Sequence, residues 1–238
     1  MTSYEKTILA IQEMLSAPEM ESVPFHRFSS FTSGEVTTEL RDIFDPNQLF
    51  RLLTRLRMEK DYTLDYVYRW HTWTGFPVLY ARSRHSSALE TLEEVEALPD
   101  DARKFPFHTQ VKDFPEGFFE LELLRLLGRQ FFLFWHAGYH MVRPVCGEVT
   151  LQGLGEIIPG YEISPHMKIP VEVLDRVRAL SLDPTLEIKD ETVIVGLVLF
   201  SPWGGFNYRE TTYQADSPHT VLNERVVPVA KYDCGVMY

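Results

Sequence analysis

Two histidines, His136 and His140, have the spacing in this chain that best suits chemistry. A separation of four residues places both side chains on one side of a helix, and also on one face of a regular strand. Zinc sites use such pairs, but they need a third ligand and groups that orient the ligands. Four residues are candidates for the third ligand: His71, His108, Cys146 and Glu148. One function that the sequence permits is therefore a metal-dependent hydrolase, with Tyr139 or Glu148 near the reaction. Structural histidines would give the same spacing by chance.

A pattern of tryptophan, glycine and a second aromatic residue recurs three times. It runs from Trp73 to Phe76, from Trp135 to Tyr139 and from Trp203 to Phe206. Each copy lies where a strand is expected to turn, and glycine tolerates the positive φ angles of tight turns. Three hairpin corners covered by aromatic rings would explain the pattern structurally. The functional hypothesis is that the corners line the mouth of one pocket, where their rings hold a flat or apolar ligand. The candidate ligand-binding residues are Trp73, Trp135, His136, Tyr139, His140, Trp203 and Phe206.

The sequence contains none of the common catalytic or nucleotide-binding motifs. It has no G-x-x-x-x-G-K-[ST] loop, no H-E-x-x-H helix, no G-x-S-x-G elbow and no C-x-x-C pair. Gly153-Leu154-Gly155 starts like a dinucleotide-binding loop, but Gly160 follows at the wrong spacing. Cys146 would need activation as a nucleophile, and its neighbourhood offers one cation, Arg143, without a cysteine-enzyme signature. The sequence therefore leaves open whether the chain is an enzyme, and it assigns neither catalytic residues nor a cofactor.

The chain is acidic, with 34 aspartates and glutamates against 23 lysines and arginines and a net charge of −11. A negative surface repels phosphate backbones, so neither nucleic acid nor an anionic membrane is expected as a partner. A small molecule or a basic protein partner remains open. The densest negative charge lies between residues 90 and 101, which favours either a solvated helix face or a docking surface for a basic protein. Its members are Glu90, Glu93, Glu94, Glu96, Asp100 and Asp101.

Several features favour a soluble protein of the cytoplasm. The two cysteines, Cys146 and Cys234, are too few for a disulfide framework, so we expect reduced thiols. The first residues, MTSYEKTILAIQEML, carry acidic side chains and no basic region before an apolar run, unlike a signal peptide. The longest apolar stretch, 193–200, is too short to span a bilayer.

Periodicity and turn residues predict the elements that must position these side chains. Helices are expected at residues 3–16, 46–58, 87–98, 116–127 and 170–180, the third of them opened by a capping box of Ser87 and Glu90. A hairpin is expected over 63–80, turning near Thr74 and Gly75, with further strands at 193–200, 207–213 and 226–229. Residues 131–146 are expected to form one long strand, or two strands broken at Gly138. A loop or a short strand pair is expected at 17–44, a loop at 99–115 and mostly loop at 151–168.

These elements predict an α+β fold, with a mostly antiparallel sheet and four or five helices packed mainly on one face. Helices and strands do not alternate as a doubly wound parallel sheet requires. A single domain over residues 1–238 is expected, with 99–115 as the one candidate seam. The function that fits best is a binding or interaction protein, which uses either an aromatic-lined pocket or an acidic docking surface. The metal-dependent hydrolase is the alternative.

Overall fold

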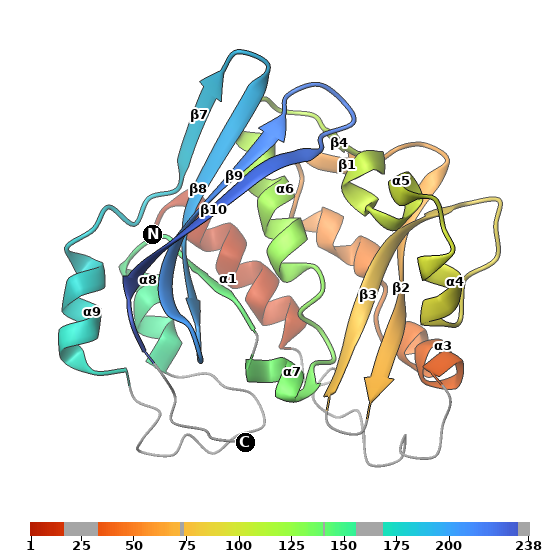
Figure 1. Cartoon of the computed structure of the whole chain (residues 1–238), viewed down its shortest axis with the longest axis horizontal. Helices are drawn as coiled ribbons and strands as arrows, with labels where there is room; N and C mark the ends of the chain where they lie inside the picture. Colours follow the sequence, from red (N-terminus) through yellow and green to blue (C-terminus); the bar gives the residue numbers. More distant parts are fainter. Residues whose placement is uncertain (17–32, 72–73, 140, 156–168, 233–238) are drawn as a thin grey trace.

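The computed structural model of the chain describes residues 1–16, 33–71, 74–139, 141–155 and 169–232. Helices and strands follow each other irregularly along these residues, and every strand pair among them is antiparallel (Figure 1). This arrangement confirms the α+β fold with antiparallel sheets. The described strands are divided among three sheets of five, three and two strands.

The five-stranded sheet is built from the second half of the chain. Its strands are β6 (Arg143–Val145), β7 (Thr185–Lys189), β8 (Thr192–Ser201), β9 (Gly205–Gln214) and β10 (Val221–Ala230). Strands β10, β9 and β8 lie in that order, and β7 and β6 share the remaining edge of β8. Strand β8 is buried on both faces over most of its length, which explains its nearly continuous apolar sequence.

The three-stranded sheet contains the predicted hairpin. Strands β2 (Tyr62–His71) and β3 (Thr74–Ser83) pair over their full length, and β5 (Phe134–Trp135) adds to the start of β3. A separate ladder joins β1 (Leu56–Met58) to β4 (Thr109–Val111).

Helix α6 (Glu116–Leu127) lies at the centre of the molecule, between the two larger sheets (Figure 1). It is buried on nearly all sides, and Gly128 follows it at the predicted end. Helix α1 (Ser3–Leu15) packs beside it, with the rings of Tyr4 and Phe119 4.5 Å apart. The main core around α6 draws side chains from both halves of the chain, from Ile8 to Tyr213.

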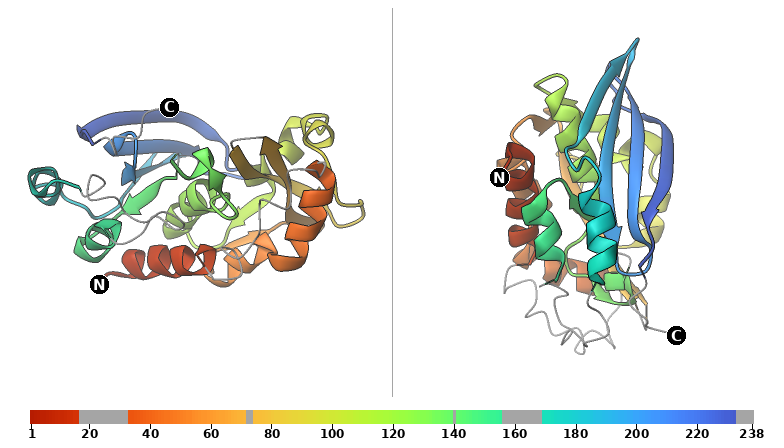
Figure 2. Two further views of the ribbon diagram at one scale, coloured as in Figure 1. Left: turned by 90° about the horizontal axis from the view of Figure 1, so that it is seen from below. Right: turned by 90° about the vertical axis from the view of Figure 1, so that its left-hand side faces the viewer.

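The shorter helices cover the two ends of the molecule. Figure 2 shows α3 (Ser33–Ile43) on one side of the hairpin β2–β3, and α4 (Leu92–Glu96) and α5 (Asp100–Arg103) on the other. At the opposite end, α8 (Glu148–Gln152) and α9 (Val171–Arg178) enclose a second apolar cluster with the last residues of β8. Helix α7 (His136–Tyr139) is a single turn after β5.

Several predicted elements were wrong, and packing explains the differences. Residues 33–43 form α3 instead of a loop, because Val36 and Leu40, four residues apart, are buried in the main core. The predicted helix 46–58 ends as a 3-10 helix at Arg51, because residues 56–58 pair with β4. The expected loop 99–115 contains α5, a 3-10 helix and β4.

Two further predictions, the start of a helix and the extent of a strand, also need correction. The capping box that opens the helix before Leu98 is formed by Thr91 and Glu94, so that α4 starts four residues later than predicted. Residues 131–146 do not form one long strand: β5 and β6 are separated by α7, which contains Gly138, as the alternative of two strands expected, and five of the described residues are in strands. Local sequence pattern did not show the helical turn or how short the strands are, because β5 pairs with β3 and β6 with β8.

Candidate functional site

The first two tryptophan corners are adjacent in the three-stranded sheet. Thr74 pairs with Trp135, and Gly75 pairs with Phe134. Trp73 lies outside the described residues, as do the side chains of Trp135, His136 and Tyr139. The backbone therefore brings these two corners together, whereas a shared pocket of their side chains stays a prediction.

Gly75 lies within β3 and not in the predicted turn. It pairs with Trp70 in the β2–β3 ladder, and Thr74 pairs with His71. A Cβ atom on Gly75 would overlap the hydroxyl oxygen of Tyr68. That hydroxyl donates a 2.6 Å hydrogen bond to the carbonyl of Phe132. Glycine is thus required here because a buried tyrosine crosses the strand.

The third corner connects β8 to β9 in the five-stranded sheet. Ser201 pairs with Gly205, whose φ of +66° suits glycine, and Trp203 is half-buried in the turn. Phe206 is fully buried, with its ring 4.9 Å from that of Phe200. Figure 1 shows the turn end of β8 and β9, helix α7 and the turn end of β2 and β3 along the same lower side of the molecule.

The histidine pair is only partly described. His136 is the first residue of α7, whereas His140 lies outside the described residues, so that a metal site at this pair stays a prediction. Within the described part of the chain, no group of three His, Cys, Asp or Glu side chains is arranged to hold a metal ion. Two of the candidates for the third metal ligand instead contact other side chains. His108 binds Glu59 at 2.8 Å, and Glu148 forms an ion pair with Arg178 at 3.0 Å.

Cys146 is unsuited to nucleophilic chemistry in this fold. It is a free thiol that is fully buried in the main core. Burial, and then the carboxylate of Glu5, raise the pKa of Cys146 to about 12, so the thiol is protonated at neutral pH.

Much of the acidic run at residues 90–101 is engaged within the chain. The carboxylate of Glu94 accepts hydrogen bonds from the backbone of Glu90 and Thr91. Asp100 pairs with Arg103 and Lys104 on its own helix. The hypothesis of a docking surface for a basic protein is weakened, because these carboxylates already have partners.

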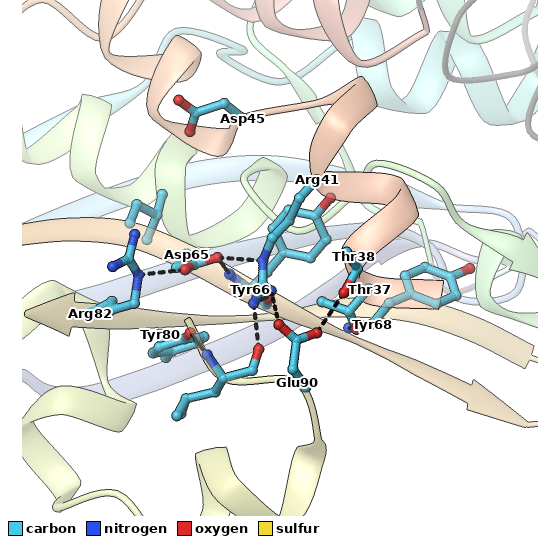
Figure 3. Close-up of polar contacts among 12 residues, drawn as sticks. Thr37, Thr38, Arg41, Asp45, Asp65, Tyr66, Tyr68, Tyr80, Arg82 and Glu90 are labelled. Atoms are coloured by element: carbon cyan, nitrogen blue, oxygen red, sulfur yellow. Dashed lines mark hydrogen bonds and ion pairs between the residues drawn. The ribbon is translucent and has the colours of Figure 1, made fainter. Parts of the chain in front are cut away.

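Glu90 belongs to a partly exposed polar cluster around the buried Asp65, which fixes α3 to the three-stranded sheet (Figure 3). Arg41 of α3 donates to Asp65 and to Glu90, each at 3.0 Å, and also to the carbonyls of Tyr66 and Leu89. Arg82 approaches Asp65 from the opposite side at 2.6 Å (Figure 3). The guanidinium of Arg41 is thus surrounded by acceptors, and the cluster serves structure.

Arg143, the first residue of β6, is a buried arginine in the opposite situation. It is only 9% exposed, and among the described residues its guanidinium has one side-chain contact, 3.7 Å from Nη2 to the sulfur of Met141. Among the described residues, no carboxylate lies within ion-pair distance of its guanidinium, and burial alone lowers the pKa of Arg143. A buried cation without an anion costs free energy, so its position needs an explanation.

The register of β6 places Arg143 beside the third corner. Arg143 is directly opposite Phe200, and Phe200 is opposite Phe206, so these side chains share one face of the sheet. The β8–β9 turn that carries Trp203 begins two residues after Phe200, because Ser201 is the last residue of β8 in the ladder. A cation, buried rings and a half-buried tryptophan therefore lie on neighbouring strands at one end of the sheet.

The sequence contained a signal for Arg143 that motif reasoning missed. It is the only lysine, arginine, aspartate or glutamate between residues 131 and 146, a stretch dominated by aromatic and aliphatic residues. A single positive charge that is buried with such a stretch costs free energy unless an anion pairs with it.

Comparison of the chain with known protein families, with curated protein sequences and with solved structures finds no match. No helix in the described part of the chain has both the length and the apolar character to cross a membrane.

Proposed function

We propose that this protein binds an anionic small molecule with an aromatic or apolar body, and that Arg143 holds the acidic group. The observation that carries the proposal is the burial of the Arg143 guanidinium without a carboxylate partner among the described residues. The planar, forked donors of arginine match carboxylate and phosphate oxygens, so such a ligand would supply the missing acceptors.

The setting of Arg143 supports a ligand with an apolar body. Phe200 and Tyr232 have their ring centres 5.5 Å apart on the same side of the sheet end, and Trp203 follows in the turn. Binding sites for small molecules usually combine apolar or aromatic walls with few polar groups that fix orientation.

The expected location in the cytoplasm is part of this proposal. Cys146 is a free thiol, which agrees with a reducing compartment. A strongly acidic chain repels small anions at long range, so an anionic ligand has to be held by a local, desolvated cation. Arg143 fits this requirement better than an exposed lysine or arginine would.

A titration of the full chain with aromatic acids tests the proposal. Benzoate and phenyl phosphate would be compared with benzyl alcohol, their neutral counterpart, by calorimetry and by the shift in thermal midpoint. The acids should bind at least about tenfold more tightly than the alcohol, as one charge-assisted hydrogen bond requires.

Two variants separate a specific site from general electrostatics. Arg143→Met should abolish the preference for acids, whereas Arg57→Met, which removes the same charge from an exposed position, should preserve it. Equal binding of the acids by wild type and Arg143→Met, or a lack of any preference over the alcohol, would overturn the assignment of Arg143.

A further inference from the structure

A second group of arginines lies between helix α6 and strands β9 and β10. The guanidinium groups of Arg125 and Arg209 form ion pairs with two carboxylates, those of Glu122 and Glu224, and the charge of Arg129 interacts with Arg125, Arg209 and Glu224. We call these five residues the arginine cluster. It holds an excess of positive charge within a chain whose net charge is −11.

Glu122 forms the closed, inner side of the arginine cluster. It is 1% exposed, and its carboxylate lies 3.1 Å from Nε of Arg125 and 3.5 Å from Nε of Arg209. The hydroxyls of Thr211 and Tyr213 also donate to Glu122. Burial, and then the carboxylate of Glu122, raise the pKa of Tyr213 well above its ordinary value, so its hydroxyl stays a donor. Glu122 is therefore fully engaged and fixes two of the arginines.

Glu224 forms the open, outer side of the arginine cluster. It lies on β10, a strand at the sheet edge, and its side chain is 38% exposed. It is opposite Thr211 in the β9–β10 ladder, and its carboxylate forms ion pairs with both Arg125 and Arg209. A single exposed carboxylate thus bridges two guanidinium groups that Glu122 holds from behind.

Arg129 has no carboxylate of its own. It follows Arg125 by four residues, is exposed, and forms no ion pair with any residue that the structure describes. Desolvation of the guanidinium, and then the charges of Arg125 and Arg209, lower the pKa of Arg129, against the opposite effect of Glu224. The local potential around Arg129 is therefore positive in spite of the acidic chain.

We propose that Arg125, Arg129 and Arg209 form a binding site for an oxyanion, either a carboxylate or a phosphate, which takes the place of Glu224. In this site Glu122 keeps Arg125 and Arg209 in position, while Glu224 acts as an internal competitor that occupies the site when no ligand is bound. Guanidinium groups bind oxyanions through paired, charge-assisted hydrogen bonds, and a phosphate offers enough oxygen atoms for all three.

The arginine cluster is separate from the site proposed around Arg143. Arg143 shares a sheet face with Phe206, and Phe206 is three residues from Arg209 along β9. An odd separation on a strand places Phe206 and Arg209 on opposite faces of the sheet. The two proposals can therefore fail independently.

The test is a titration of the full chain with inorganic phosphate and, separately, with acetate, at constant ionic strength. Binding is followed by calorimetry and by the nuclear magnetic resonance signals of the arginine Nε–H groups. Glu224→Gln removes the competitor and should bind the preferred oxyanion about tenfold more tightly than wild type, the change expected for one charge-assisted contact. The stronger of the two titrations identifies phosphate or carboxylate as the group that is bound.

Glu210→Gln is the matched control. Glu210 is a partly exposed carboxylate on β9 that pairs with Arg225 at 3.0 Å, on the face opposite to Arg209. Glu210→Gln removes the same charge as Glu224→Gln but should change binding less than about twofold. The reason is that distance from the bound oxyanion weakens the effect of the Glu210 charge and salt screens it. In the Glu224→Gln background, Arg129→Gln should reverse the gain, whereas Arg225→Gln should not.

Three results would overturn the proposal. They are the absence of saturable binding to Glu224→Gln, equal gains in Glu224→Gln and Glu210→Gln, and a gain that Arg129→Gln leaves unchanged. The Nε–H signals of Arg125 and Arg209 should shift on titration in Arg143→Met as they do in wild type, which distinguishes this site from the one proposed above. Circular dichroism of each variant shows that a lost signal does not come from unfolding.

Discussion

Arg143 and Arg41 should respond in opposite directions to the same substitution. Arg41→Met removes a cation from between two carboxylates and two carbonyls, whereas Arg143→Met removes a cation whose one side-chain contact in the described part of the chain is a sulfur. Methionine preserves most of the buried length of an arginine side chain in both cases. The pair of variants thus measures what the partners of a buried guanidinium contribute.

The magnitudes follow from the partners. Breaking a buried ion pair from one side costs about 3–5 kcal/mol, and the 19% exposure of the Arg41 side chain places the loss near the lower value, about 3 kcal/mol. Replacing a buried charged group by an apolar one of similar size is neutral or stabilising by up to about 4 kcal/mol. For Arg143, which is 9% exposed and has no ion partner among the described residues, we expect a gain of about 1–3 kcal/mol without ligand.

Urea unfolding followed by tryptophan fluorescence gives both free energies of unfolding from the same experiment. The slope of the free energy of unfolding against urea concentration should be the same for wild type and both variants. Differences in the urea midpoint then report differences in stability. A loss of more than about 1 kcal/mol in Arg143→Met would show that the guanidinium is stabilised by the protein itself. That result would refute the reasoning behind the anionic ligand.

Three further predictions concern buried groups. Cys146 should resist iodoacetamide at pH 8 in the folded protein and react after unfolding, because its raised pKa keeps the thiol protonated; peptide mass spectrometry would detect native labelling, which would contradict this. Glu122→Gln should lower the free energy of unfolding by about 2–4 kcal/mol, since Arg125 loses its buried counter-ion; an unchanged urea midpoint would mean that another carboxylate compensates. Gly75→Ala should cost about 1–3 kcal/mol, because the added methyl group displaces the Tyr68 hydroxyl; a stability equal to wild type would show that the sheet can open there.

The elements that the sequence predicted well are those with strong, local patterns. Helix α6 has helix-forming residues and a glycine at its end, and the hairpin β2–β3 alternates over ten residues. Helix α9 was expected at 170–180 and is found at Val171–Arg178. In each case the residues that decide the conformation lie within one or two turns or along one strand.

The elements that were missed depend on distant partners. Helix α3 contains glycine and threonines that favour loops, yet it is held by Arg41, whose partners Asp65 and Glu90 follow 24 and 49 residues later. Strand β1 exists because residues 109–111 pair with it. Local propensity contains no information about either contact.

The candidate sites also differ in how much of them the local sequence could predict. The tryptophan corners are visible as a sequence pattern, but their pairing through Thr74 and Trp135 required the sheet. The arginine cluster combines residues of α6 with residues of β9 and β10 that lie about 80 to 100 positions later, so no local pattern could show it.

By itself, the sequence determined composition, charge, the mixed α+β class and the absence of the common catalytic motifs. These properties depend on residue types and on short-range spacing, which are fixed along the chain. Only the tertiary structure decided that the partly buried Arg41 has counter-charges, whereas the buried Arg143 has none among the described residues. The physical reason is that the free energy of a charge depends on its distances to other charges and to water, and folding alone sets those distances.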